Sequence, residues 1–282
     1  CVEFAQQRIH PNWHNKTQIF NFMINKPRPN REFLLLLIQH FDLKNYSHSL
    51  CWKNAQVNRN KMISNTQNPV YQEIMQNTEL TVPSKSYTFG QEVFLDHGLR
   101  YGHVKNADNY AGLLQHTVFE PSCVSLITEP SFYERETLTT EKTIMAIYGG
   151  TLPIWVGGWG IPQSMRQLGF DVFDDIIDHS YEHLTDPWDR AYYAVVKNIT
   201  VLNDPSLAKD FVQANLKRLQ HNVDLLEQNV FLAYCEQQLD GYDPATKSVL
   251  IKILQERNSH AVRHESLNNS QSRFIQVTQK FF

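Results

Sequence analysis

The sequence is poor in cysteine, and its cysteines are not grouped. The 282 residues include four cysteines, at positions 1, 51, 123 and 235, and no Cys-x-x-Cys pair. This wide spacing argues against a disulfide framework and against a cysteine-based zinc site. It is typical of proteins from reducing compartments, so we expect a cytoplasmic protein.

Long apolar runs and a strong charge imbalance are also missing. No run reaches the roughly 18 apolar residues of a membrane span, and no signal peptide is visible. The net charge is only −3, which does not indicate a strongly basic surface, so we do not expect nucleic acid as a partner. The sequence has no internal repeats or low-complexity tracts.

Enough apolar residues are present for a sizeable core. Hydrophobic residues make up 41% of the chain and aromatic residues 12%. This length permits one large or two ordinary domains. The sequence begins with Cys1 rather than Met, which is consistent with a fragment or a processed product.

Residues 122–160 have the pattern of a strand, a loop, a helix and a second strand. Cys123 to Thr128 and Leu152 to Val156 are short apolar runs that predict buried strands. Thr139 or Thr140 can cap a helix that has Glu141 in its first turn and ends at Gly149-Gly150. Such a βαβ unit places a helix N-terminus at the carboxyl end of a strand, where ligands bind in open α/β sheets. Because a helix N-terminus favours anions, a nucleotide phosphate is the expected ligand.

A second strand–helix pair lies upstream. Ile19 to Ile24 predicts a strand, and Asn30 is a plausible cap for the helix that begins with Arg31. A cation in the first turn opposes the helix dipole, so Arg31 either serves a ligand phosphate or is a solvated surface residue.

These two segments, at residues 18–42 and 122–175, resemble the donor-binding part of the α-1,3-fucosyltransferases. In that family a Phe-Glu-Asn-Ser segment is followed by Tyr-Val-Thr-Glu-Lys, a helix and a Pro-(Ile/Val)-x-x-Gly strand. Here the corresponding residues are Thr128-Glu-Pro-Ser, Thr140-Glu-Lys and Leu152-Pro-Ile-Trp-Val-Gly. The family's strand that leads to an Arg at a helix start is similar to Ile19–Arg31.

The resemblance implies an α/β fold: a Rossmann-like donor-binding domain of a GT-B-type glycosyltransferase. It implies transfer of a sugar, with inversion, from a GDP-fucose-like nucleotide-diphosphate sugar to a glycan or other hydroxyl acceptor. The resemblance also implies that Arg31 and Lys142 bind the donor phosphates, that Glu141 binds the ribose and that Glu129 faces the sugar ring. It also implies no metal and no cofactor, the donor being a substrate.

The sequence departs from the family at two site positions. Pro130 replaces the Asn after the family's Glu, and Leu138 replaces its Tyr, so the base contacts and the sugar are left open. Tyr133 and Arg135 are available to take the role of the replaced residues. Trp159 is a candidate for stacking on a base or sugar. In the family the general base comes from a preceding domain, so no residue here is assigned that role.

The remaining chain divides into three parts. Residues 1–17 are interpreted as a linker or the remnant of a preceding domain, 18–185 as the nucleotide-sugar-binding domain, and 186–282 as a helical region. Residues 170–178 predict a strand that runs into an acidic turn. Its four aspartates (Asp171, Asp174, Asp175 and Asp178) are interpreted as turn residues and helix caps, not as metal ligands.

Two other functions stay open. One is a non-catalytic α/β module that binds a nucleotide or a partner protein. The other is a glycosyltransferase that acts on modified DNA, supported only by the basic residues of the polar stretch 53–68, which predicts a loop.

Overall fold

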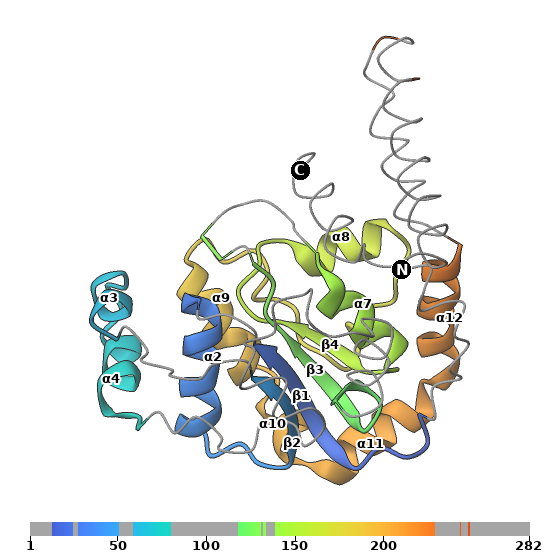
Figure 1. Cartoon of the computed structure of the whole chain (residues 1–282), viewed down its shortest axis with the longest axis horizontal. Coiled ribbons are helices and arrows are strands. Elements are labelled where there is room, and N and C mark those ends of the chain that lie inside the picture. The colour runs from blue at the N-terminus through green and yellow to red at the C-terminus, as the bar shows by residue number, and fades with distance from the viewer. Residues whose placement is uncertain are drawn as a thin grey trace, which may run out of the picture.

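The computed structural model describes residues 13–24, 28–50, 59–79, 118–130, 132–133, 139–228, 243 and 248. Within them lies a parallel sheet of four strands in the order β2-β1-β3-β4 (Figure 1). The strands are β1 (Gln18–Ile24), β2 (Tyr46–Leu50), β3 (Ser122–Ile127) and β4 (Leu152–Trp155). The predicted α/β class is therefore confirmed. Both central strands are almost wholly buried, as expected for a parallel sheet covered on two faces.

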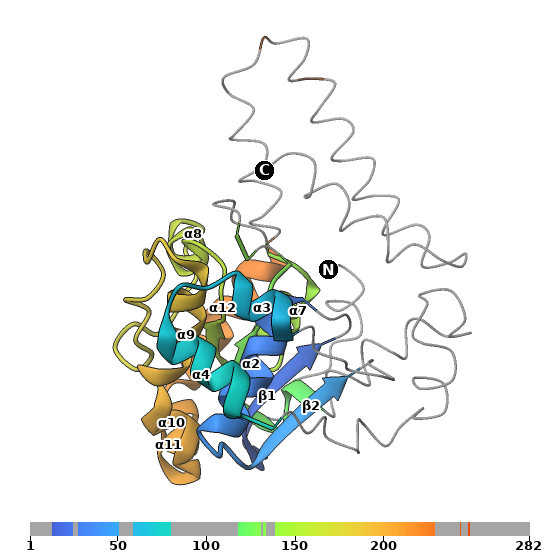
Figure 2. The same cartoon turned by 90° about the vertical axis from the view of Figure 1, so that its left-hand side faces the viewer.

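The connections between strands run in opposite directions from the middle of the sheet. Helix α2 (Pro29–His40) leads from β1 to β2, and α7 (Glu141–Tyr148) leads from β3 to β4. Because such crossovers are right-handed, opposite directions place the two helices on opposite faces. Figure 1 shows α2 on one side of the strands and α7 on the other, and Figure 2 shows α2 on the nearer side.

Further helices complete both layers. They are α3 (Arg59–Ser64), α4 (Pro69–Asn77), α8 (Ile161–Gln167), α9 (Pro187–Val196), α10 (Ile199–Asn203), α11 (Pro205–Ala214) and α12 (Leu216–Glu227). Helices α4 and α9 pack on α2, whereas α12 packs on α7. The buried side chains of sheet and helices form one continuous core. The helices expected from residue 186 onward thus share the core of the sheet, as far as residue 228.

Residues 13–17, expected to be a linker, pack against the end of α7. The Trp13 ring packs so closely on Gly150 that a Cβ at this residue would lie only 2.3 Å from the ring. Its Nε1 donates to the Tyr148 carbonyl at 3.3 Å. Gly150 also has φ +57°, so both its left-handed backbone and the lack of space for a Cβ favour glycine at this position. Lys16 donates to the Gly149 carbonyl at 2.7 Å. These residues therefore cap the carboxyl end of α7.

Three local predictions are wrong. Residues 170–178 form turns rather than a strand, because Phe173 has a left-handed φ of +63° and its carbonyl accepts from Ile176 and Ile177. The cap of α2 is Arg28, not Asn30, since Pro29 occupies the first helical position that proline favours. Part of the polar stretch 53–68 is helical, as α3, and its residues 53–58 lie outside the described residues.

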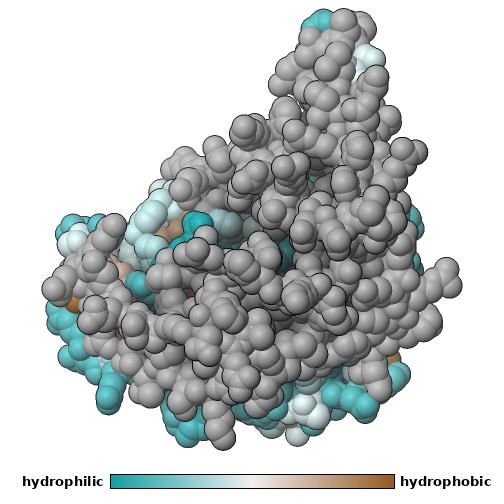
Figure 3. Space-filling view, viewed as in Figure 1, coloured by the Kyte–Doolittle hydropathy of each residue, from teal (hydrophilic) through white to brown (hydrophobic). Residues whose placement is uncertain are grey.

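The surface of the described residues is largely hydrophilic where Figure 3 shows it, along the edge formed by α10 and α11. None of the described helices combines the length and the apolar character that crossing a membrane would require.

Candidate functional site

The candidate site lies at the carboxyl ends of β1 and β3, the adjacent strands from which the connections run in opposite directions across the sheet. These adjacent strands are followed by α2 and α7, whose first turns flank that edge from opposite faces. This is the switch point at which open α/β sheets bind ligands. All four residues predicted for the donor (Arg31, Glu129, Glu141 and Lys142) lie in the first turns of these helices or directly after β3.

A side chain from α2 joins the two halves of this edge. Asn30 Nδ2 donates to the Glu129 carbonyl at 2.9 Å, and the Arg28 guanidinium donates to the Pro130 carbonyl at 3.1 Å. Asn30 thus fixes the start of α2 against the end of β3 instead of capping its own helix. The segment that follows β3 is held from the α2 side.

Glu129 is held from the other side, by α7. Its Oε1 accepts from the Thr140 amide at 2.9 Å and from Thr143 Oγ1 at 2.6 Å, and its Oε2 accepts from Thr140 Oγ1 at 2.5 Å. The side chain is 1% exposed. A carboxylate in this position gives the Thr140 amide an acceptor and interacts favourably with the dipole at the helix start. The structure therefore places Glu129 inward, against α7, where the sequence suggested a sugar ring.

Replacing Glu129 with Gln tests this anchoring role. The amide keeps the size of the side chain but loses one of the two acceptor oxygens that together face three donors, so we expect a loss of about 1–3 kcal/mol in the free energy of unfolding. Urea unfolding would measure it, with Glu141→Gln as the control because that neighbour has a side chain 28% exposed. Equal losses in the two variants would contradict the anchoring role.

Two basic side chains stand in the first turns that flank the edge. Arg31 of α2 and Lys142 of α7 are each 4% exposed. Lys142 Nζ has two long contacts, 3.4 Å to Thr140 Oγ1 and 3.5 Å to Glu141 Oε1. A buried ammonium at the N-terminus of a helix opposes the dipole, so the local preference for an acidic residue is overridden here.

Some buried polar atoms at the same edge have no hydrogen-bond partner within the described part of the chain. Thr128 Oγ1 and Asn30 Oδ1 are among them, and both residues are 0% exposed. Orphaned buried groups are rare in native proteins, which marks this edge as unusual.

Glu32 was not predicted from the sequence, and it lies beside the site without facing it. Burial raises the pKa of its carboxyl group to about 7. Residues two apart on a helix point in nearly opposite directions, and Asn30 points at β3. Glu32 therefore points away from β3, and we do not assign it to the site.

Arg190 of α9 is the second residue that sequence reasoning missed. It is 1% exposed, and its guanidinium donates to the carbonyls of Phe132 at 2.8 Å, Gly157 at 2.9 Å, Leu184 at 2.7 Å and Thr185 at 3.1 Å. It ties the loops after β3 and β4 to the segment before α9. One sequence feature could have indicated that Arg190 is buried: it is adjacent to the apolar face of the helix formed by Ala191 and Ala194.

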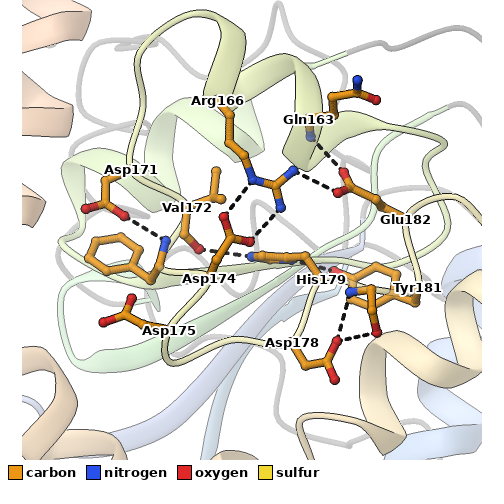
Figure 4. A network of polar contacts seen from close by, with 12 residues as sticks. Gln163, Arg166, Asp171, Val172, Asp174, Asp175, Asp178, His179, Tyr181 and Glu182 are labelled. Atoms are coloured by element: carbon orange, nitrogen blue, oxygen red, sulfur yellow. Dashed lines mark hydrogen bonds and ion pairs between the residues drawn. The ribbon is translucent and has the colours of Figure 1, made fainter.

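The four aspartates of residues 171–178 lie in a network beyond β4 (Figure 4). Arg166 pairs with both Asp174 oxygens, at 2.6 and 2.7 Å, and with Glu182 at 2.7 Å. Its hydrogen bonds hold the pKa of Asp174 below the ordinary value. Arg218 pairs in the same way with Asp171 and Asp175.

The same aspartates also shape turns. Asp171 and Asp178 each accept from a backbone amide two residues later, as expected of turn residues. Glu182 accepts from the Gln163 amide at 2.7 Å and so caps α8. His179 is buried between the Val172 carbonyl and the Tyr181 hydroxyl, and burial lowers its pKa. Among the described residues, no group of His, Cys, Asp and Glu is arranged to hold a metal ion.

Two cavities lie away from the switch point. One, of about 460 Å³, is lined by this network (Arg166, Asp174, Asp175, Ile176, Asp178, His179, Ser180 and Glu182). The other, of about 500 Å³, lies at the amino ends of β1 and β2 beside Gln39 and Tyr46. In the first, each carboxylate is already paired with a basic side chain, from Arg166, Lys197 or Arg218. The second is at the edge opposite the helix N-termini. We therefore give more weight to the switch point than to either cavity.

Comparison with known proteins adds no family assignment: the chain matches no protein-family model, no curated protein and no solved structure.

Proposed function

We propose that the chain binds the diphosphate of a nucleotide sugar at the switch point, as the donor-binding part of a fucosyltransferase-like glycosyltransferase of the GT-B type. The observation that carries the proposal is the pair Arg31 and Lys142, two buried cations in the first turns of helices on opposite faces of one sheet edge. The acceptor would be a glycan or another hydroxyl compound.

The chemistry fits a diphosphate leaving group. When the sugar departs, negative charge develops on the nucleotide, and fixed cations and helix amides stabilise it. Arg31 can bind phosphate oxygens in a bidentate manner, whereas Lys142 supplies a point charge. Glu141, at the first position of α7 and partly exposed, is the carboxylate that we assign to the ribose hydroxyls. Glu129 acts indirectly in this proposal, by holding α7 in place.

Calorimetric titration of the chain with GDP and UDP tests the proposal. We expect Lys142→Ala to weaken binding of the preferred nucleotide about 10- to 100-fold, because a charge-assisted hydrogen bond contributes about 1.5–3 kcal/mol. Lys217→Ala is the matched control, since it removes the same charge from an exposed position of α12. The proposal fails when neither nucleotide binds the wild-type chain, or when both variants bind as the wild type does.

A non-catalytic nucleotide-binding module is the second candidate. The hydrogen bonding of Glu129 favours it, since both carboxylate oxygens already accept from the start of α7. The two functions differ in turnover. A module would bind the nucleotide with the same dependence on Lys142 and would release no nucleoside diphosphate from GDP-fucose or another sugar donor in the presence of acceptor glycans.

A further inference from the structure

Tyr133 is an exposed aromatic residue held in a fixed position. Its side chain is 49% exposed, although it follows the buried Phe132. Its ring meets those of Phe132 and Trp188 at steep angles, with centroids 4.9 and 6.4 Å apart. Asn65 Nδ2 donates to its hydroxyl at 3.4 Å. Edge-to-face contacts of this kind are favourable and fix the orientation of a ring.

Described backbone that precedes Tyr133 is anchored as well. The Pro130 carbonyl accepts from Arg28, and the Phe132 carbonyl accepts from Arg190. The start of the segment is fixed by Glu129 and Asn30, as described above. These contacts reduce the conformational entropy that is lost when a ligand contacts the Tyr133 ring.

A short series of packing contacts connects Tyr133 to the candidate site. The Phe132 ring lies 2.7 Å from where a Cβ on Gly157 would stand, and Asn30 Cβ lies 3.3 Å from the same point. Gly157 has φ +103°, so a side chain here would be strained as well as crowded. Tyr133 thus borders the first turn of α2 through only Phe132 and Gly157. This is the turn that contains Arg31.

We infer that Tyr133 is the stacking surface for the heterocyclic base of the nucleotide, an assignment that rests on the proposed function. A nucleoside diphosphate carries a charged end and a planar end. The cations at the switch point suit the first, and an exposed ring that is linked to the first turn of α2 through Phe132 and Gly157 suits the second. Stacking on an aromatic side chain accepts any base, because every base has a π-face. Tyr133 therefore contributes affinity for the nucleoside and does not select among bases.

The experiment compares nucleotides with inorganic pyrophosphate on three variants. Titration calorimetry would use GDP, UDP and pyrophosphate with Tyr133→Ala, Tyr133→Phe and Tyr193→Ala. Tyr193 is the matched control, a tyrosine of α9 that is 38% exposed. We expect Tyr133→Ala to weaken the preferred nucleotide roughly 10-fold or more and to leave pyrophosphate unchanged, while Tyr133→Phe and Tyr193→Ala bind as the wild type.

The outcomes separate this inference from the proposed function. Nucleotide binding that is unchanged in Tyr133→Ala overturns the stacking assignment alone. So does a loss in Tyr133→Ala that is equal for nucleotide and pyrophosphate, because the residue would then support the loop and not the base. Failure of the wild-type chain to bind either nucleotide overturns both the proposed function and the stacking assignment. Nucleotide binding that is retained in Tyr133→Phe and lost in Tyr133→Ala supports the stacking assignment.

Discussion

Replacing Arg190 with Met is expected to lower the free energy of unfolding by about 3–5 kcal/mol. The guanidinium is 1% exposed and donates to four backbone carbonyls in three loop segments. Met fills much of the same volume but donates nothing, so these buried acceptors would lose their partner. Each orphaned acceptor costs free energy, because the carbonyl has given up water without gaining a replacement.

Arg218→Met is the control for charge and size. Arg218 also makes several hydrogen bonds, to Asp171 and Asp175, but its side chain is 32% exposed and its partners can be hydrated when it is removed. We expect a loss of about 1 kcal/mol for it, as for other surface ion pairs. Guanidinium chloride unfolding of both variants would measure the difference. An Arg190→Met protein as stable as Arg218→Met would contradict the proposed role of the buried guanidinium.

The second large effect is on the pH dependence of stability, and it comes from Glu32 and Lys16. Burial raises the pKa of Glu32 to about 7 from an ordinary 4.5, so the folded protein binds an extra proton between these values. Its contribution to stability is complete below pH 4.5 and is lost as the pH rises to about 7. At about 1.4 kcal/mol per pKa unit, the loss is on the order of 3 kcal/mol.

Lys16 acts in the opposite sense at higher pH. Burial lowers the pKa of its amine to about 7 from 10.5, although Cys123 and Glu120 oppose the change. The folded protein therefore binds fewer protons than the unfolded chain between pH 7 and 10.5. Its contribution is complete above pH 10.5 and is lost as the pH falls through about 7, by an amount on the order of 5 kcal/mol. Together the two groups make their smallest contribution near neutral pH.

Variants isolate the two groups from all others that titrate. Urea unfolding would be measured from pH 4.5 to 10.5 for the wild type, Glu32→Gln and Lys16→Met. The stability of the wild type relative to Glu32→Gln should fall up to about pH 7 and then level off. Relative to Lys16→Met it should be level up to about pH 7 and then rise. Differences that stay constant with pH would show that neither group has a shifted pKa.

Local sequence patterns predicted the elements of the site well. Thr140 caps α7, Glu141 stands in its first turn, and apolar β-branched runs became β1, β3 and β4. These features depend on neighbouring residues, on side-chain branching and on turn chemistry, which a sequence displays directly. Residues 170–178, which were wrongly predicted to form a strand, contain apolar and β-branched residues of the same kinds. There, ion pairs with Arg166 and Arg218 and local turns took precedence.

The sequence by itself determined that the chain is an α/β protein with charged residues at the starts of two helices, because period and capping are local properties. Only the tertiary structure decided how those residues are used. It turned Glu129 into α7, set Asn30 against β3, and placed Arg190 and Tyr133 around the same edge. These outcomes depend on strand order and on which carbonyls and rings meet across more than 50 residues of sequence, as between Arg190 and Phe132. No local pattern carries that information.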